Sequence, residues 1–77
     1  MTADETAVFT ALATNKRGLQ ATGIATRLRW FRQSAIREFQ RVPNEHRTLK
    51  ALKGLMNKGV VLEHLSASGS RYKLNRG

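Results

Sequence analysis

Basic side chains are the most numerous groups in this sequence that could take part in binding chemistry. The 77 residues include 14 Lys and Arg against 5 Asp and Glu, which gives a formal net charge of +9 at pH 7. All the basic residues lie from Lys16 onward, where only Glu38, Glu45 and Glu63 oppose them. Such a surface attracts polyanions, so nucleic acid is the partner that the charge predicts. Anionic membrane and acidic protein are the alternatives.

Residues 44–57 are predicted to form a helix that could contact DNA. An α-helix fits the major groove of B-DNA, and its N-terminal half usually meets the base edges. Arg47 is the best candidate for a base contact, because a guanidinium pairs bidentately with guanine. Lys50 and Lys53 suit phosphates. A solvated helix face is the alternative interpretation. The predicted outward positions are Asn44, His46, Arg47, Lys50, Lys53 and Asn57.

A predicted hairpin near the C-terminus is the second candidate for DNA contact. Residues 60–65 are rich in β-formers, residues 71–74 alternate polar and apolar types, and a Gly-Ser loop lies between them. This wing, residues 66–73, would lie on the DNA backbone or in the minor groove, where an Arg is often inserted. A plain hairpin with solubilising charges is the alternative. The predicted contacts are Ser68, Arg71 and Lys73.

Residues 22–42 admit two interpretations. Their apolar residues recur at spacings of three and four, which keep one face of a continuous helix, so we expect helix through most of the segment. The equal alternative is a break near Gln33, with Ser34 capping a separate helix. Trp30 and Ile36 lie off the apolar face. An exposed Trp suggests a partner surface or a stacked Arg, and the alternative is that the helix breaks and both residues join the core. The apolar residues are Ile24, Leu28, Phe31, Ala35, Phe39 and Val42.

The same segment carries a predicted second basic surface. Its five arginines spread over several directions on a helix, so they do not form one stripe. Either they are solvated or they contact a second duplex, which is an architectural role. The residues are Arg27, Arg29, Arg32, Arg37 and Arg41.

The remaining elements complete a recognisable order. A first helix is expected from about Asp4, its cap, to Asn15, with Gly18 then adopting positive φ. Leu19 is expected to make a short strand pairing, and Pro43 ends the long segment. Helix, short strand, helix, helix and hairpin is the order of a winged helix-turn-helix. We therefore predict one α+β, mostly helical domain of this class over residues 1–77, with the second helix extended or split.

Catalytic chemistry finds no support in the residue types. His46 and His64 are far apart in sequence, and no cluster of carboxylates accompanies them. No Cys, Gly-rich phosphate loop or metal-ligand spacing is present. We predict no enzyme, no metal, no cofactor and no small-molecule substrate.

The last thirty or so residues resemble the globular domain of linker histones. The likeness lies in the basic helix over 49–59, which ends in Lys58-Gly59, and in the Gly-Ser wing over 66–75, which closes on Tyr72, Lys73 and Leu74. It is shared more loosely by many bacterial and archaeal winged-helix regulators. The resemblance implies a nucleosome or chromatin partner. Linker histones carry long Lys-rich tails that this chain lacks, and nothing in them matches residues 29–42.

The function predicted first is that of a small transcriptional regulator that binds duplex DNA through residues 44–57 and 66–73. A sequence-tolerant architectural protein of nucleoid or chromatin is the alternative. A protein-interaction or RNA-binding module is a third hypothesis, motivated by Trp30 and by the apolar edge of Leu49 and Met56, which also suggests a homodimer seam. We expect an intracellular protein of cytoplasm, nucleoid or nucleus, because small secreted domains usually need disulfides. No membrane partner is expected, since no run approaches the ~20 apolar residues of a span.

Overall fold

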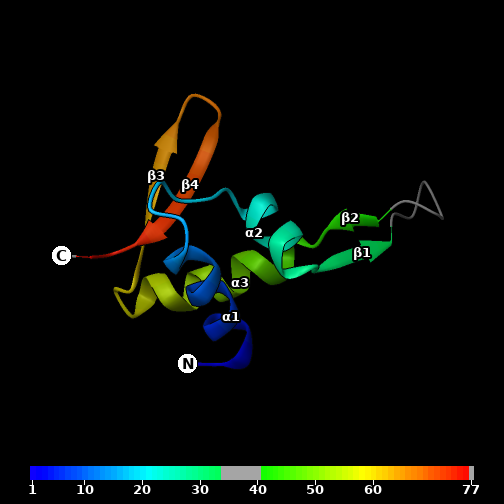
Figure 1. The fold of residues 1–77 in the computed structure, drawn as a ribbon, viewed down its shortest axis with the longest axis horizontal. Coiled ribbons are helices and arrows are strands. Elements are labelled where there is room, and N and C mark those ends of the chain that lie inside the picture. The colour runs from blue at the N-terminus through cyan, green and yellow to red at the C-terminus, as the bar shows by residue number, and fades with distance from the viewer. Residues whose placement is uncertain (34–40, 77) are drawn as a thin grey trace.

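Three helices and two antiparallel sheets of two strands each make up residues 1–33 and 41–76, the part of the chain that this computed structural model describes (Figure 1). The predicted α+β class is confirmed. The elements in chain order are α1 (Ala3–Ala13), α2 (Ala21–Leu28), β1 (Phe31–Gln33), β2 (Arg41–Pro43), α3 (Glu45–Asn57), β3 (Val61–Ser66) and β4 (Gly69–Leu74).

The first helix is capped by Thr2 and not, as predicted, by Asp4. The Thr2 hydroxyl accepts a hydrogen bond from the Glu5 backbone N–H at 3.1 Å, and the Glu5 carboxylate accepts one from the Thr2 N–H at 2.8 Å. This reciprocal capping box satisfies two backbone donors that a helix start otherwise leaves unpaired. Because Thr2 takes the cap, the Asp4 carboxylate is left to contact another helix.

The predicted strand pairing of Leu19 is confirmed. The N–H and C=O of Leu19 exchange hydrogen bonds with those of Tyr72 on β4, at 2.9 and 2.7 Å. Gly18 precedes it with φ of +82°, and a Cβ at this position would come within 2.8 Å of the Tyr72 carbonyl oxygen. Glycine is therefore required here both for its backbone angle and for the close approach. The β4 strand consequently lies between Leu19 and β3.

The long helix predicted over residues 22–42 is wrong within the described residues. The α2 helix ends at Leu28, and Arg29 caps it in the left-handed conformation, with φ of 57°. Residues 31–33 then pair with 41–43 as a two-stranded ribbon, β1–β2. The alternative break at Gln33 and Ser34, and the predicted positions of Ala35, Ile36 and Phe39, lie wholly or partly in 34–40, outside the described residues.

The burial of Trp30 explains why the helix stops. A left-handed residue other than Gly costs roughly 1–2 kcal/mol. A buried tryptophan removes at least ~150 Å² from water, worth about 4 kcal/mol at ~25 cal/mol per Å². Trp30 is only 9% exposed and joins the core, whereas on a continued helix it would lie off the apolar face. The prediction that a break brings Trp30 into the core is confirmed.

One hydrophobic cluster joins the three helices to the β3–β4 hairpin. Its members from α1, α2 and α3 include the predicted core residues Val8, Leu12, Ile24, Leu52 and Leu55, all fully buried. The hairpin adds its inner-face residues, and Met56 packs against the edge of the cluster. The remaining buried members are Ala25, Trp30, Ala51, Val61 and Tyr72.

A buried carboxylate also joins α1 to α3. Glu5 is 6% exposed, and its Oε1 accepts a hydrogen bond from Lys58 Nζ at 2.7 Å. The carboxylate lies directly against Gly54 of α3, where a Cβ would collide with its second oxygen. Gly54 therefore makes room for Glu5, although Gly in a helix interior costs up to ~1 kcal/mol relative to Ala.

Gly54→Ala is expected to destabilise the wild-type chain, because the new methyl group displaces Glu5 from Lys58 and from the Thr2 cap. In a Glu5→Ala background the same substitution should stabilise the fold by roughly 0.5–1 kcal/mol, the ordinary helix preference for Ala. Urea unfolding of the four proteins in this cycle measures both effects. A stabilising Gly54→Ala in the wild type would show that Glu5 does not need the space.

Candidate nucleic-acid interface

The outward face of α3 carries a strip of exposed polar and basic side chains. At ~100° per residue, four of its residues fall within about 60° of one another, on the side opposite the buried Leu52 and Leu55. The predicted outward positions of these four residues agree with their exposure. The strip consists of His46, Lys50, Lys53 and Asn57, all exposed.

Asn44 has a different role from the other predicted contacts of this helix. It is the N-cap of α3, and its Oδ1 accepts a hydrogen bond from the Arg47 backbone N–H at 3.1 Å. Its backbone N–H donates to the carbonyl of Trp30 at 2.8 Å, which fixes the helix start against the end of α2. The Asn44 side chain therefore positions the strip.

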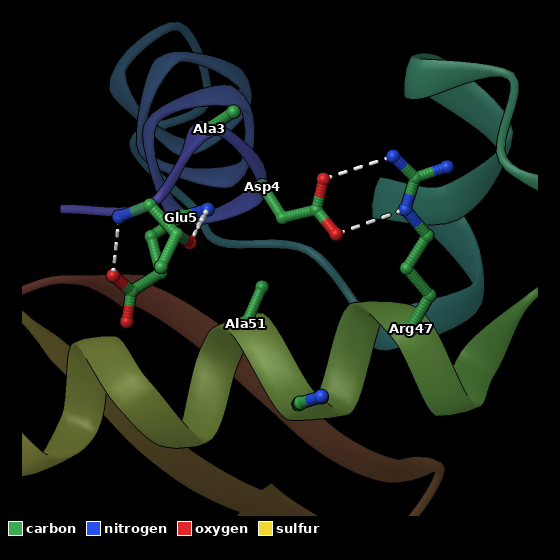
Figure 2. Close-up of a pocket in the computed structure, with 7 residues that line it drawn as sticks. Ala3, Asp4, Glu5, Arg47 and Ala51 are labelled. Atoms are coloured by element: carbon green, nitrogen blue, oxygen red, sulfur yellow. Dashed lines mark hydrogen bonds and ion pairs between the residues drawn. The ribbon is translucent and has the colours of Figure 1, made fainter.

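Arg47 lies toward α1 and not on the outward strip. Its Nε and Nη2 donate to the two carboxylate oxygens of Asp4 at 2.9 and 2.8 Å, and Figure 2 shows the two side chains facing each other between the helices. Its Cζ also lies 4.1 Å from the centroid of the Trp30 ring. Two of the guanidinium donors are thus paired within the fold, and the pairing directs the side chain toward α1 and off the outward strip.

This pairing shifts the protonation of both partners. The hydrogen bond from Arg47 lowers the pKa of Asp4 below its ordinary value of 3.8, with a further contribution from the charges of Arg47 and Lys50. The bond to Asp4 raises the pKa of Arg47. The hydrogen bond from Lys58, followed by that from the Thr2 backbone, lowers the pKa of Glu5 despite its burial. These carboxylates therefore stay charged in mildly acidic solution.

Asp4 and Trp30 were not predicted to belong to this part of the molecule. Asp4 is 43 residues from Arg47 in sequence, so no helical periodicity links the two. The one signal in the sequence was the small number of acidic residues, because each of them is then expected to find a cationic partner. For Trp30 the sequence offered a partner surface, a stacked Arg or, if the helix breaks, the core, and the structure combines burial in the core with the stacked Arg47.

The wing presents its basic side chains on its outer face. In the β3–β4 register Arg71 pairs with His64 and Lys73 with Leu62, whereas Tyr72 on the opposite face is buried. Paired residues of antiparallel strands share a face, so His64, Arg71 and Lys73 lie together away from the core. Arg71 and Lys73 are exposed, as the predicted DNA contacts would need to be.

The tip of the wing is shorter than predicted and is attached to α2. Ser66 pairs with Gly69, so Ala67 and Ser68 alone form the turn. The Ser68 carbonyl accepts a hydrogen bond from Gln20 Nε2 at 3.0 Å, and the Ser66 hydroxyl donates to the Gly69 carbonyl at 2.7 Å. Gln20 occupies the N-cap position of α2 without a side-chain cap bond, because its amide reaches the wing instead.

A shallow hollow of about 310 Å³ connects α2, α3 and the wing. Glu45 and Leu49 line it from α3, Gln20 and Thr22 from the start of α2, and Ser68 from the wing tip. Leu49 is 40% exposed here, while Met56 is packed against the core, so the predicted apolar edge does not form one exposed seam. The hollow brings the α2 start, α3 and the wing onto one surface.

The predicted second basic surface is divided between a helix end and the ribbon. Arg27 is in the last turn of α2, Arg29 caps that helix, and Arg32 and Arg41 lie on β1 and β2. These four are exposed, and Arg37 lies outside the described residues.

Positive charge on the strip, the wing and the ribbon has no ion-pair partner within residues 1–33 and 41–76. The two ion pairs there, Arg47 with Asp4 and Lys58 with Glu5, both join α1 to α3. Glu63 accepts a 3.3 Å hydrogen bond from the Tyr72 hydroxyl, whose pKa is raised by burial and by this carboxylate. The acidic side chains thus leave most of the basic surface uncompensated.

Other kinds of site are not found in the described part of the chain. It contains no group of three or more His, Cys, Asp or Glu side chains arranged to hold a metal ion. None of its helices has the length and apolar character needed to cross a membrane. Comparisons with protein-family models, curated proteins and solved structures found no match to this chain.

Asp4→Asn is expected to remove part of the acid sensitivity of the fold. The pKa of Asp4 is lower in the folded than in the unfolded chain, so its stabilising effect is present above the unfolded value and is lost as pH falls through the folded value. Between about pH 5 and pH 2 the thermal midpoint of the wild type should therefore fall more than that of Asp4→Asn.

Glu45→Gln is the matched control, because Glu45 is an exposed carboxylate of α3 with no ion pair to a described residue. It should keep the wild-type acid profile. Parallel profiles for wild type and Asp4→Asn would contradict a folded-state pairing with Arg47.

Proposed function

We propose that this chain is a winged helix-turn-helix domain that binds duplex DNA, with α3 in the major groove and the β3–β4 wing on the adjacent backbone. The observation that carries the proposal is the outward strip of α3. Its His46, Lys50 and Lys53 side chains are exposed and form no ion pair with a described residue. On the neighbouring side of the helix, Glu45 and Leu49 line a hollow together with the start of α2 and the wing tip.

The topology supports the winged-helix assignment. The order of helix, Leu19 pairing, helix, helix and hairpin is that of the class, and Leu19 joins the wing through a single β-bridge to Tyr72 of β4. The departure is the β1–β2 ribbon, which stands where a helix-turn-helix ordinarily has a turn of three or four residues.

Phosphate contacts would supply most of the affinity. The Lys50 and Lys53 ammonium groups are mobile point charges suited to phosphate oxygens, and Arg71 and Lys73 extend the same chemistry along the wing. Gly69, at the wing tip, has no side chain to keep the backbone away from DNA. Asn57 is the strip residue able to pair bidentately with a base, through adenine N6 and N7.

The pairing of Arg47 favours a sequence-tolerant, architectural role over that of a sequence-reading regulator. A regulator needs rigid donors on the outward side of its recognition helix, and the guanidinium best suited to that role is turned toward α1 by Asp4 and Trp30. The strip that remains carries mostly point charges. Binding through backbone and shape requires no more than that.

Lys50→Gln/Lys53→Gln should weaken duplex binding and reduce the magnitude of the slope of log K against log salt by about 1.8, at ~0.9 for each lost phosphate contact. Fluorescence anisotropy of a labelled random-sequence duplex at several salt concentrations measures the slope. Lys16→Gln/Arg17→Gln removes the same charge from the turn between α1 and α2 and should change it much less. An equal reduction of the slope in the two variants would show that the effect comes from net charge alone.

Arg47→Gln is expected to lower stability without changing relative affinities among duplex sequences, because Arg47 binds Asp4 and not a base. Competition between a selected-sequence pool and random duplex measures the preference, and thermal unfolding measures the stability. A wild-type preference that Arg47→Gln flattens would identify a regulator in which DNA displaces Asp4.

A further inference from the structure

The β1–β2 ribbon is a basic projection that takes no part in the DNA contacts proposed for α3 and the wing. It leaves the body beyond the N-terminal end of α3, while the wing extends in a different direction (Figure 1). Its described residues are Phe31–Gln33 and Arg41–Pro43, and Arg29 lies at its base. Arg29, Arg32 and Arg41 are exposed.

The register of the ribbon places charge on both of its faces. Arg32 pairs with Val42, whereas Arg41 pairs with Gln33, one position further along β1. Successive residues of a strand point to opposite faces, so Arg32 and Arg41 lie on opposite sides of the ribbon. Whichever face lies along a polyanion, an arginine is presented to it. Neither arginine forms an ion pair with a described residue.

The Arg32 side of the ribbon is continuous with the outward strip of α3. Arg32, Val42 and Pro43 line one hollow of about 500 Å³ together with Glu45 and His46 at the start of α3. A duplex that contacts His46 therefore passes within reach of Arg32. The longest extent of the molecule is 43 Å, a little more than the 34–36 Å of one turn of B-DNA. One duplex can span the wing, α3 and the ribbon.

We infer that the β1–β2 ribbon is a second DNA-binding arm that contacts a phosphate of the same duplex, beyond the N-terminal end of α3, through Arg32 on the side of the ribbon that is continuous with the strip. The inference rests on the proposed duplex binding by α3 and adds to it a contact from an element that the winged-helix class does not require. It also gives a role to the end of α2 at Leu28, after which the chain forms the basic ribbon.

The test uses the full chain and a fluorescein-labelled, random-sequence duplex of about 16 base pairs, which exceeds one helical turn. Arg32→Gln/Arg41→Gln is expected to weaken binding and reduce the magnitude of the salt slope by about 0.9, the value for the one phosphate contact that the face along the duplex makes. Arg32→Lys/Arg41→Lys keeps both charges and should retain most of the wild-type slope, because lysine also serves phosphate as a point charge. Arg32 and Arg41 are exposed, so the thermal unfolding of both variants should match that of the wild type.

The variants separate the failure of this inference from that of the proposed function. If Lys50→Gln/Lys53→Gln lowers the slope and Arg32→Gln/Arg41→Gln leaves it unchanged, the ribbon does not bind and α3 still does. If the ribbon variant alone lowers it, the proposed α3 interface is wrong and the ribbon contact remains. Equal losses in the ribbon variant and in Lys16→Gln/Arg17→Gln would overturn the inference by assigning the effect to net charge.

The mass of the complex decides whether the arm contacts the same duplex. Analytical ultracentrifugation at excess DNA should give one duplex per protein for the wild type and for the ribbon variant. A complex of two duplexes that the ribbon substitutions reduce to one would overturn the inference, since the ribbon would then bridge separate molecules.

Discussion

The burial of Trp30 is the interaction on which the arrangement of the other elements depends. Bringing this ring into the core ends α2 at Leu28 and turns the chain through the left-handed Arg29 into the ribbon. The Trp30 carbonyl then accepts the Asn44 N–H, so the same residue fixes where α3 begins. Arg47, in the first turn of α3, lies over the ring and reaches Asp4 on α1. A single aromatic side chain thereby sets the relation of all three helices.

The scarce acidic residues have a defined place in this arrangement. Asp4 and Glu5 join α1 to α3 through Arg47 and Lys58, on the side of α3 away from the outward strip. Lowered pKa values keep both carboxylates charged, so the pairing persists in mild acid. The consequence is a separation of charge. Acidic side chains neutralise Arg47 and Lys58, which join the helices, whereas the cations of the strip, the wing and the ribbon form no ion pair with a described residue. That separation, more than the total charge of the chain, favours a polyanionic partner.

Local signals made most of the fold predictable from sequence. Asn44 and Gly59 delimit α3, the alternation of residues 71–74 indicates a strand, and the periodicity around Leu52 and Leu55 identifies the outward Lys50 and Lys53. The ribbon was not predictable in this way, because apolar spacings of three and four fit a continuous helix as well as the observed break. What distinguishes the observed break from a continuous helix is a tertiary interaction, the burial of Trp30. The pairing of Arg47 with Asp4 is likewise tertiary, since 43 residues separate the partners.

The orientation of α3 about its own axis decides which of its side chains face outward and could meet a duplex. Arg47 and Lys58 are held on the α1 side, while Glu45 and Leu49 face the hollow beside the wing. The strip between them contains two lysines, a histidine and an asparagine, and no guanidinium. In the proposed complex, donors of fixed geometry on the strip would be confined to His46 and Asn57, at opposite ends of the helix. Arg71 on the wing and Arg32 on the ribbon would add charge beside the duplex, and any preference among sequences would come mainly from how readily each one adopts the shape that these elements demand.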